Sequence, residues 1–332
     1  MKKTLKEISN EIHLLGRCGW DGDGLYLDWS ASGFQFLYRG RRIEFHFLPL
    51  TVAQPIYLKI QTDEYAFSFP VSTGNEVLTL NFPKESEHKI RILRQSEGDV
   101  PLRISHAVTE NDSVLIPWKR RDRKITFLGD SITCGFGVLA PATENVFTTY
   151  QEDVTAAYAY LTAEAFDADY QIVSISGQGV VRNCNGDLGF PIPSFYQVQN
   201  RTRKEAFDPS KFPSDVIVMA GGTNDVGGRV SDTEFTEAAH TFLNVLRKDF
   251  PDAAIVWLYG MMNREFIPTI EKIVRTRRES GDERITFLPV ATIRREDGEV
   301  GAVGHPNEKA QRRFAEELCR VIAEMTGWHA EK

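Results

Sequence analysis

The sequence predicts an α/β protein in two parts. Residues 1–120 are expected to form an accessory β-sandwich of jelly-roll type. Residues 121–332 are expected to form a three-layer α/β/α domain, with a parallel sheet between helices. Two observations predict this division. Short β-type segments broken by turns fill the first part, whereas strand-length apolar runs alternate with helical periodicity in the second. The boundary falls in Trp118–Arg123, where one pattern gives way to the other.

The first part shows strand candidates at regular spacing, enriched in aromatic and β-branched residues. Leu25–Trp29 and Phe34–Tyr38 flank a turn at Ser30–Gly33. A second turn is expected at Arg39–Arg42, before Ile43–Leu48, where apolar and polar residues alternate. The further candidates are Ile56–Gln61, Glu76–Phe82, His88–Arg94 and Leu102–His106. No convincing helix interrupts this series, which favours a sandwich.

The second part alternates buried strands with helices. The strand candidates are Ile125–Leu128, Gln171–Ile175, Val216–Ala220, Ala253–Tyr259 and Ile285–Pro289. The helix candidates are Thr155–Phe166, Asp232–Phe250, Ile267–Glu279 and Asn307–Met325. Strands that are apolar throughout indicate a parallel sheet covered on both faces. Because such sheets bind ligands beyond the carboxyl ends of their strands, the residues that follow each strand are candidate site residues.

Composition excludes several classes of protein. The net charge is −7, from 39 basic and 46 acidic residues, so no basic footprint favours nucleic acid or an anionic membrane. No apolar run approaches transmembrane length. Met1–Gly16 has the lysines of a signal peptide but no apolar core, so a chain that natively starts at Met1 is expected to be cytoplasmic. The cysteines are scattered, which argues against a zinc site or a disulfide scaffold; they are Cys18, Cys134, Cys184 and Cys319.

Small and polar residues follow three of the predicted strands. Ser131 ends a Gly-Asp-Ser tripeptide after the first strand, and taken alone this position favours a helix cap. Gly177 lies in Ser-Gly-Gln-Gly after the second strand, where glycines commonly make a turn. Asn224 lies in Gly-Gly-Thr-Asn-Asp after the third, which also fits an Asx turn. His305 precedes the last helix, and a lone histidine is more often structural than catalytic.

Together these four residues indicate more than each does alone. An acyl-transfer site needs a hydroxyl nucleophile, a base that takes its proton, and donors for the developing oxyanion. The strand ends offer the Ser131 hydroxyl, a glycine N–H, the Asn224 amide and the His305 imidazole. All of them are expected on the same rim of the sheet.

This set and its order resemble the SGNH, or GDSL-type, hydrolases, in which the serine lies in Gly-Asp-Ser. The four residues that name that family correspond to Ser131, Gly177, Asn224 and His305, and the resemblance covers Lys124 to Met325. A narrower likeness, over nearly the whole chain, is to carbohydrate esterase family 2. It is carried by GDSITCGFGV, SISGQGVVRN and the sandwich motifs GR, LDWS and HKIR. Those enzymes pair an N-terminal jelly roll with an SGNH domain and remove acetyl groups from sugars.

The resemblance implies a role for each of these residues. Ser131 would be the nucleophile and His305 the base, while the N–H groups of Ser131 and Gly177 and the side chain of Asn224 would form the oxyanion hole. No metal or organic cofactor is implied, and the expected partner is an acetylated sugar or oligosaccharide. The alternatives are a general short-chain esterase or thioesterase and, from another class, a non-catalytic carbohydrate-binding protein.

One residue of the usual catalytic triad is missing. The acid of this superfamily usually stands three residues before the histidine, where this chain has Ala302, or two before, where it has Val303. Some family 2 esterases use a Ser–His dyad, in which a backbone carbonyl holds the imidazole, and this chain resembles those. The carboxylates nearby in sequence, which remain the alternative, are Glu296, Asp297 and Glu299.

Several further residues are candidate substrate contacts or supports. The candidate substrate contacts are Arg182, Asn183, Trp257 and Tyr259. Arg182 and Asn183 equally suit a solvated loop, and Trp257 suits the core under a helix. The carboxylates beside the catalytic residues, Asp130 and Asp225, are expected to brace loops through backbone hydrogen bonds. Cys134 is expected to be a packing residue rather than a second nucleophile.

Overall fold

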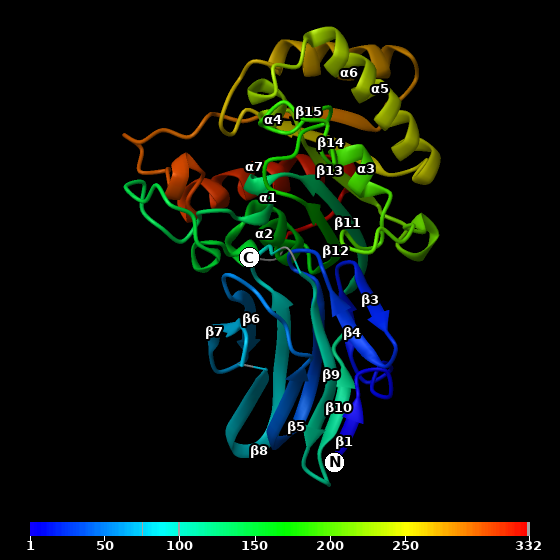
Figure 1. Ribbon diagram of the computed structural model, residues 1–332. Coiled ribbons are helices and arrows are strands. Elements are labelled where there is room, and N and C mark those ends of the chain that lie inside the picture. Colours follow the sequence, from blue (N-terminus) through cyan, green and yellow to red (C-terminus); the bar gives the residue numbers. More distant parts are fainter. Residues whose placement is uncertain (75, 99, 331–332) are drawn as a thin grey trace. The chain divides into compact units, whose positions relative to one another are not determined.

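The computed structural model describes residues 1–74, 76–98 and 100–330, which form two compact units (Figure 1). The first unit comprises Met1–Arg120 together with Thr148–Tyr150 and Gln199–Glu205. The second comprises Arg121–Phe147, Gln151–Val198 and Ala206–Lys332. Two short segments that follow residue 120 in the sequence therefore belong to the first unit. No helix within the described ranges is long and apolar enough to cross a membrane.

The first unit is an antiparallel β domain, as predicted. Its strands are β1 (Lys2–Thr4), β2 (His13–Leu15), β3 (Cys18–Asp21), β4 (Gly24–Leu27), β5 (Gly33–Phe47), β6 (Ile56–Thr62), β7 (Ala66–Val71), β8 (Val77–Arg94), β9 (Leu102–Thr109) and β10 (Val114–Pro117). The main path through the sheet is β3-β4-β9-β5-β8-β6-β7. Its core is rich in aromatic side chains, among them Phe34, Phe36 and Phe45, whose rings contact one another.

The predicted turn at Arg39–Arg42 is wrong. β5 runs unbroken through it, and β8 likewise joins two segments that the sequence suggested as separate strands. The pairing of β5 with β8 shifts register between Gly40 and Arg42, which is the mark of a β-bulge. A Cβ at Gly40 would lie 2.5 Å from the hydroxyl oxygen of Tyr38, so the bulge needs glycine. A glycine flanked by arginines is a typical turn sequence, but here Gly40 forms a bulge within one long strand.

The second unit is built on a parallel sheet of order β12-β11-β13-β14-β15. The strands are β11 (Arg121–Gly129), β12 (Ala168–Ser174), β13 (Val216–Ala220), β14 (Ala254–Tyr259) and β15 (Ile285–Pro289). The helices are α1 (Ser131–Cys134), α2 (Tyr158–Ala165), α3 (Ile192–Tyr196), α4 (Thr223–Gly227), α5 (Asp232–Asp249), α6 (Ile267–Glu279) and α7 (Glu308–Thr326). Short 3₁₀ turns are η1 (Thr149–Gln151), η2 (Val154–Ala156), η3 (Pro209–Lys211) and η4 (Ala302–Gly304).

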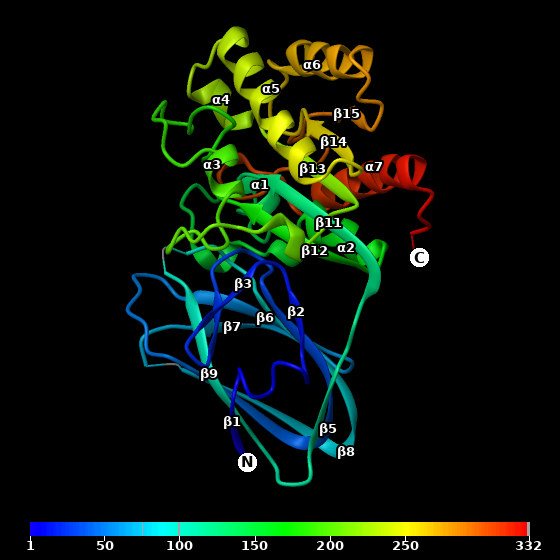
Figure 2. The same ribbon diagram turned by 90° about the vertical axis from the view of Figure 1, so that its right-hand side faces the viewer.

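The helices lie on both faces of this sheet, which confirms the predicted layers. Right-handed crossovers between parallel strands place α5 and α6 on one face, because the chain moves from β13 to β14 to β15. The crossover from β11 to β12 runs the other way and places α2 on the opposite face, where α7 packs against it (Figure 2). The predicted helix at Thr155–Phe166 is divided, because Ala157 is extended, with ψ 151°.

The strand order fixes where a site is expected. β11 lies between β12 and β13, so the chain reverses its direction of travel across the sheet at β11. Ligands of open α/β sheets bind beyond the carboxyl ends of the strands at such a reversal. The segments that directly follow β11, β12 and β13 contain Ser131, Gly177 and Asn224, the first and last of them in the short helices α1 and α4.

Candidate active site

Ser131 stands at a tight junction between β11 and α1. A Cβ at Gly129 would lie 2.0 Å from the hydroxyl oxygen of Thr133, so only glycine fits where the strand ends. Asp130 is the N-cap of α1, and its Oδ1 accepts a hydrogen bond from the N–H of Ile132 at 3.0 Å. The alternative reading of Ser131 as the cap is therefore wrong. Ser131 is the first residue of the helix, and its N–H is one that a helix leaves without an internal partner.

The His305 imidazole joins the serine to the backbone. Its Nε2 lies 2.9 Å from the Oγ of Ser131, and its Nδ1 lies 3.2 Å from the carbonyl oxygen of Val303. A carbonyl oxygen can only accept a hydrogen bond, so Nδ1 must carry the proton in this contact. The lone pair of Nε2 then points toward the Ser131 hydroxyl. Burial lowers the pKa of His305 below its ordinary value of 6.5, against the opposing effect of the bond to Val303. Burial is the larger of the two effects, so the neutral ring is favoured near neutral pH.

The carboxylates that follow β15 are engaged elsewhere. Asp297 pairs with Arg294 at 2.6 Å, and Glu296 lies 3.7 Å from the same guanidinium. Glu299 accepts two hydrogen bonds from Arg313, at 2.8 and 2.9 Å. Each of the three candidate acids thus pairs with an arginine, whereas the imidazole bonds a backbone carbonyl.

The Asn224 amide ties three loops together. Its Nδ2 donates to Oδ2 of Asp130 at 3.1 Å and to the carbonyl of Gln178 at 2.9 Å. These acceptors are the immediate neighbours of Ser131 and Gly177 in sequence. Gly177 has φ +79°, in the left-handed region that favours glycine. The structure therefore brings together the serine, glycine and asparagine loops that the sequence singled out.

Asp225 braces the loop after β12. Its carboxylate accepts hydrogen bonds from the N–H groups of Val180 and Val181, both at 2.7 Å, and of Arg182 at 3.1 Å. Burial raises the pKa of Asp225, and the three N–H groups oppose that rise. As expected from the sequence, this side chain supports a loop through backbone hydrogen bonds.

The candidate substrate contacts on this loop already have partners in the chain. The guanidinium of Arg182 forms an ion pair with Glu234 at 2.7 Å. The side-chain oxygen of Asn183 accepts hydrogen bonds from the N–H groups of Asn185 at 3.1 Å and Asp187 at 2.9 Å. Asn183 thus shapes its own loop, and Arg182 links that loop to α5.

Trp257 and Tyr259 lie in the core. Their exposed fractions are 0% and 1%, because β14 is an interior strand covered on both faces. The indole nitrogen of Trp257 donates to the carbonyl of Gly221 at 3.1 Å, and the hydroxyl of Tyr259 donates to Asn263. The burial of Trp257 agrees with its reading as a core residue, and neither ring presents an exposed face on which a sugar could stack.

Two phenylalanines beside the imidazole were not anticipated. The ring centroid of Phe136 lies 4.5 Å from that of His305, and Phe147 stacks on Phe136 at 3.8 Å. The sequence held a signal for the first of them. Phe136 is a large apolar residue between two glycines directly after the serine helix, and such a loop is a place where a site is expected.

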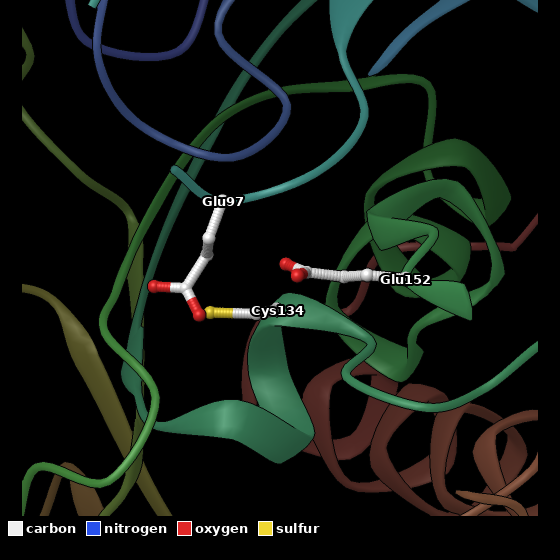
Figure 3. Close-up of side chains that lie close together, drawn as sticks. All are labelled: Glu97, Cys134 and Glu152. Carbon is white, nitrogen blue, oxygen red and sulfur yellow. The ribbon is translucent and has the colours of Figure 1, made fainter. Parts of the chain in front are cut away.

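Cys134 and Glu152 are buried side chains of the same unit, drawn in Figure 3 with Glu97, which belongs to the first unit. The Sγ of Cys134 donates to the hydroxyl of Ser174 at 3.1 Å, and the residue is fully buried. Its contacts are those of a packing residue, as the sequence suggested, rather than of a second nucleophile.

Comparison with known proteins connects this geometry to a family. The sequence model of the GDSL-like Lipase/Acylhydrolase family matches residues 127–313. The cellulase/esterase CelE of Acetivibrio thermocellus is 30% identical over 221 residues, which are 63% of this chain and 26% of that protein. An acetylxylan esterase / glucomannan deacetylase of Cellvibrio japonicus is 28% identical over 75% of this chain and 70% of its own length. The chain thus spans about a quarter of the first relative.

Solved structures share the whole fold. An acetyl xylan esterase from the rumen bacterium Butyrivibrio proteoclasticus superposes with a TM-score of 0.90 at 23% identity, covering 99% of this chain and 100% of that one. A family two carbohydrate esterase from Clostridium thermocellum, in complex with cellohexaose, gives 0.87 at 24% identity, covering 96% and 99%. The fold is therefore that of carbohydrate esterase family 2 structures.

Proposed function

Since this chain belongs to the GDSL-like Lipase/Acylhydrolase family, we propose that it is a serine esterase that removes acetyl or other short acyl groups from carbohydrates. The observation that carries the proposal is the 2.9 Å contact between Ser131 Oγ and His305 Nε2, at the carboxyl end of β11. The carbohydrate substrate is supported by the relatives named as acetylxylan esterases and glucomannan deacetylases.

In the first half of the reaction, the Ser131 oxygen attacks the ester carbonyl while His305 Nε2 takes its proton. The negative charge on the carbonyl oxygen is held by the N–H groups of Ser131 and Gly177 and by the Asn224 amide. In the resting structure this amide donates to Asp130 and Gln178, so the oxyanion shares it with them. The carbon–oxygen ester bond then breaks, and the imidazolium gives its proton to the leaving alcohol.

In the second half, water attacks the acyl-serine. His305 takes a proton from this water, the oxyanion forms again at the same donors, and the proton returns to the Ser131 oxygen as the acid leaves. The Val303 carbonyl holds the Nδ1–H throughout and so fixes the tautomer. A neutral carbonyl stabilises the imidazolium less than the carboxylate of a full triad does.

Hydrolysis of p-nitrophenyl acetate by the purified chain tests the proposal, with Ser131→Ala as the control. We expect activity in the first and none in the second, with both folded by circular dichroism. A panel of acetylated mono- and oligosaccharides then identifies the alcohol. A folded wild-type protein that binds these sugars and releases no acetate would overturn the proposal in favour of a carbohydrate-binding protein.

A further inference from the structure

Val303 adopts a backbone conformation that its residue type disfavours. It has φ 52° and ψ 28°, in the left-handed region, where a β-branched residue is a genuine outlier and glycine costs least. The conformation is held from both sides: its N–H donates to the carbonyl of Glu144 at 2.9 Å, and its own carbonyl accepts from His305. Both bonds use the backbone alone. Glycine would make them with less strain, so the valine side chain needs another explanation.

Burial does not supply that explanation. The Val303 side chain is 40% exposed, so much of its apolar surface remains in water. Strained residues persist where function requires them, and the inference runs from the observed outlier to the function. A partly exposed side chain at a strained backbone position is therefore a candidate for contact with a bound substrate.

Two further apolar residues, Val146 and Phe147, are linked to Val303 and the imidazole through Glu144 and Phe136. Val146 is 69% exposed and lies two residues after Glu144, which holds the Val303 N–H. Phe147 follows it and stacks on Phe136, whose ring lies beside His305. We call Val303, Val146 and Phe147 the apolar rim. The Val303 carbonyl bonds the imidazole directly, and Phe147, which follows Val146, reaches it through the ring of Phe136.

We propose that the apolar rim receives an apolar part of the leaving alcohol, and that Val303 is a specificity-determining residue. This rests on the proposed function. His305 Nε2 must deliver its proton to the leaving oxygen, so the alcohol lies on the imidazole side of the site. The groups next to the imidazole therefore contact the alcohol rather than the acyl group. An apolar rim favours an alcohol that presents C–H groups, such as the apolar face of a sugar ring, over a small hydrated one.

Two acetate esters with the same acyl group and different alcohols test this. We expect kcat/KM for cyclohexyl acetate to exceed that for methyl acetate in the wild-type enzyme. Val303→Thr keeps the shape and the β-branch but replaces a methyl with a hydroxyl, so the ratio of the two kcat/KM values should fall about fourfold or more. Val114→Thr in β10 is the matched control, since Val114 is 45% exposed and lies in the first unit; its ratio should equal that of the wild type.

Two further variants keep the test decisive. Val303→Gly removes the strain together with the side chain and should lower the ratio as Val303→Thr does. Val146→Thr changes a highly exposed residue, so folding is not at issue, and should lower it in the same direction. If all three variants keep the ratio of kcat/KM values within twofold of the wild type, the proposed role of the apolar rim is wrong, while the proposed esterase function stands. A wild-type protein that hydrolyses no acetate ester would overturn the proposed function and the rim with it.

Discussion

The Nδ1 of His305 lies 3.2 Å from the carbonyl oxygen of Val303, two residues earlier in the chain. The same ring contacts Ser131 through Nε2 at 2.9 Å. The imidazole is therefore oriented by the backbone of its own loop.

No single carboxylate near His305 should be essential. Loss of a triad aspartate costs about 10⁴ in kcat, whereas we expect Glu296→Gln, Asp297→Asn and Glu299→Gln each to lower kcat by less than about tenfold. The reason is that all three acids pair with arginines. The measurement is kcat on one acetyl ester at one pH, with His305→Ala as the inactive reference. A thousandfold drop in any one of the three would reveal a hidden triad.

Glu299→Gln should instead lower the melting temperature. Its side chain is only 8% exposed and receives two hydrogen bonds from Arg313. The variant removes this buried counter-charge and leaves the guanidinium only the more exposed Glu317, at 3.3 Å. Asp297→Asn is the matched control, because its partner Arg294 is 61% exposed and solvated ion pairs contribute little. Equal melting temperatures for the two variants would contradict this reading of the pair.

Much of the fold was predictable because it rests on local patterns. Val216–Ala220, Ile285–Pro289 and Ile267–Glu279 have the predicted bounds, since each is an apolar run or a helical period between clear end signals. The bulge at Gly40 was not predictable, because only the packing of Tyr38 distinguishes it from a turn.

The site residues also include some that were predictable from sequence and some that were not. Ser131 and Asn224 stood out as polar residues at strand ends, and the structure brings their loops together. The burial of Tyr259 was not predictable, because exposure depends on which strands and helices surround a ring and not on its neighbours in sequence. The left-handed backbone of Val303 has no sequence signal, since valine is the residue least expected there.

Asn224 should act on the transition state. Asn224→Ala is expected to lower kcat by about 10²–10³ with little change in KM, as loss of one oxyanion donor does. Asn224→Asp keeps the size but removes the donor and faces the Asp130 carboxylate, so it should be at least as impaired. Steady-state kinetics on p-nitrophenyl acetate separate the two constants. A change confined to KM would mean that Asn224 only binds substrate.

The acid limb of the pH profile should lie below pH 6.5. The base must be neutral to act, and burial lowers the pKa of His305, so the neutral form and the activity persist to more acidic pH than for a free imidazole. Phe136→Ala exposes the ring and should move the midpoint of kcat/KM upward. Phe147→Ala, which removes only the ring behind it, should move the midpoint less. A wild-type midpoint above 6.5 would contradict the effect of burial.

Short acyl chains should be preferred. The relatives named as deacetylases motivate this expectation, which a series of p-nitrophenyl esters from acetate to octanoate tests through kcat/KM. We expect the maximum at acetate or propionate. A maximum at octanoate would favour a general esterase.

Ser131 is expected to be the nucleophile, activated by His305. The most direct measurement is labelling by a p-nitrophenyl alkylphosphonate, which transfers its phosphonyl group to an activated serine, followed by peptide mass spectrometry. We predict one adduct per chain, on Ser131, with activity lost in proportion and labelling slowed strongly in His305→Ala. An adduct on another residue, or full activity in a chain fully labelled at Ser131, would contradict the account.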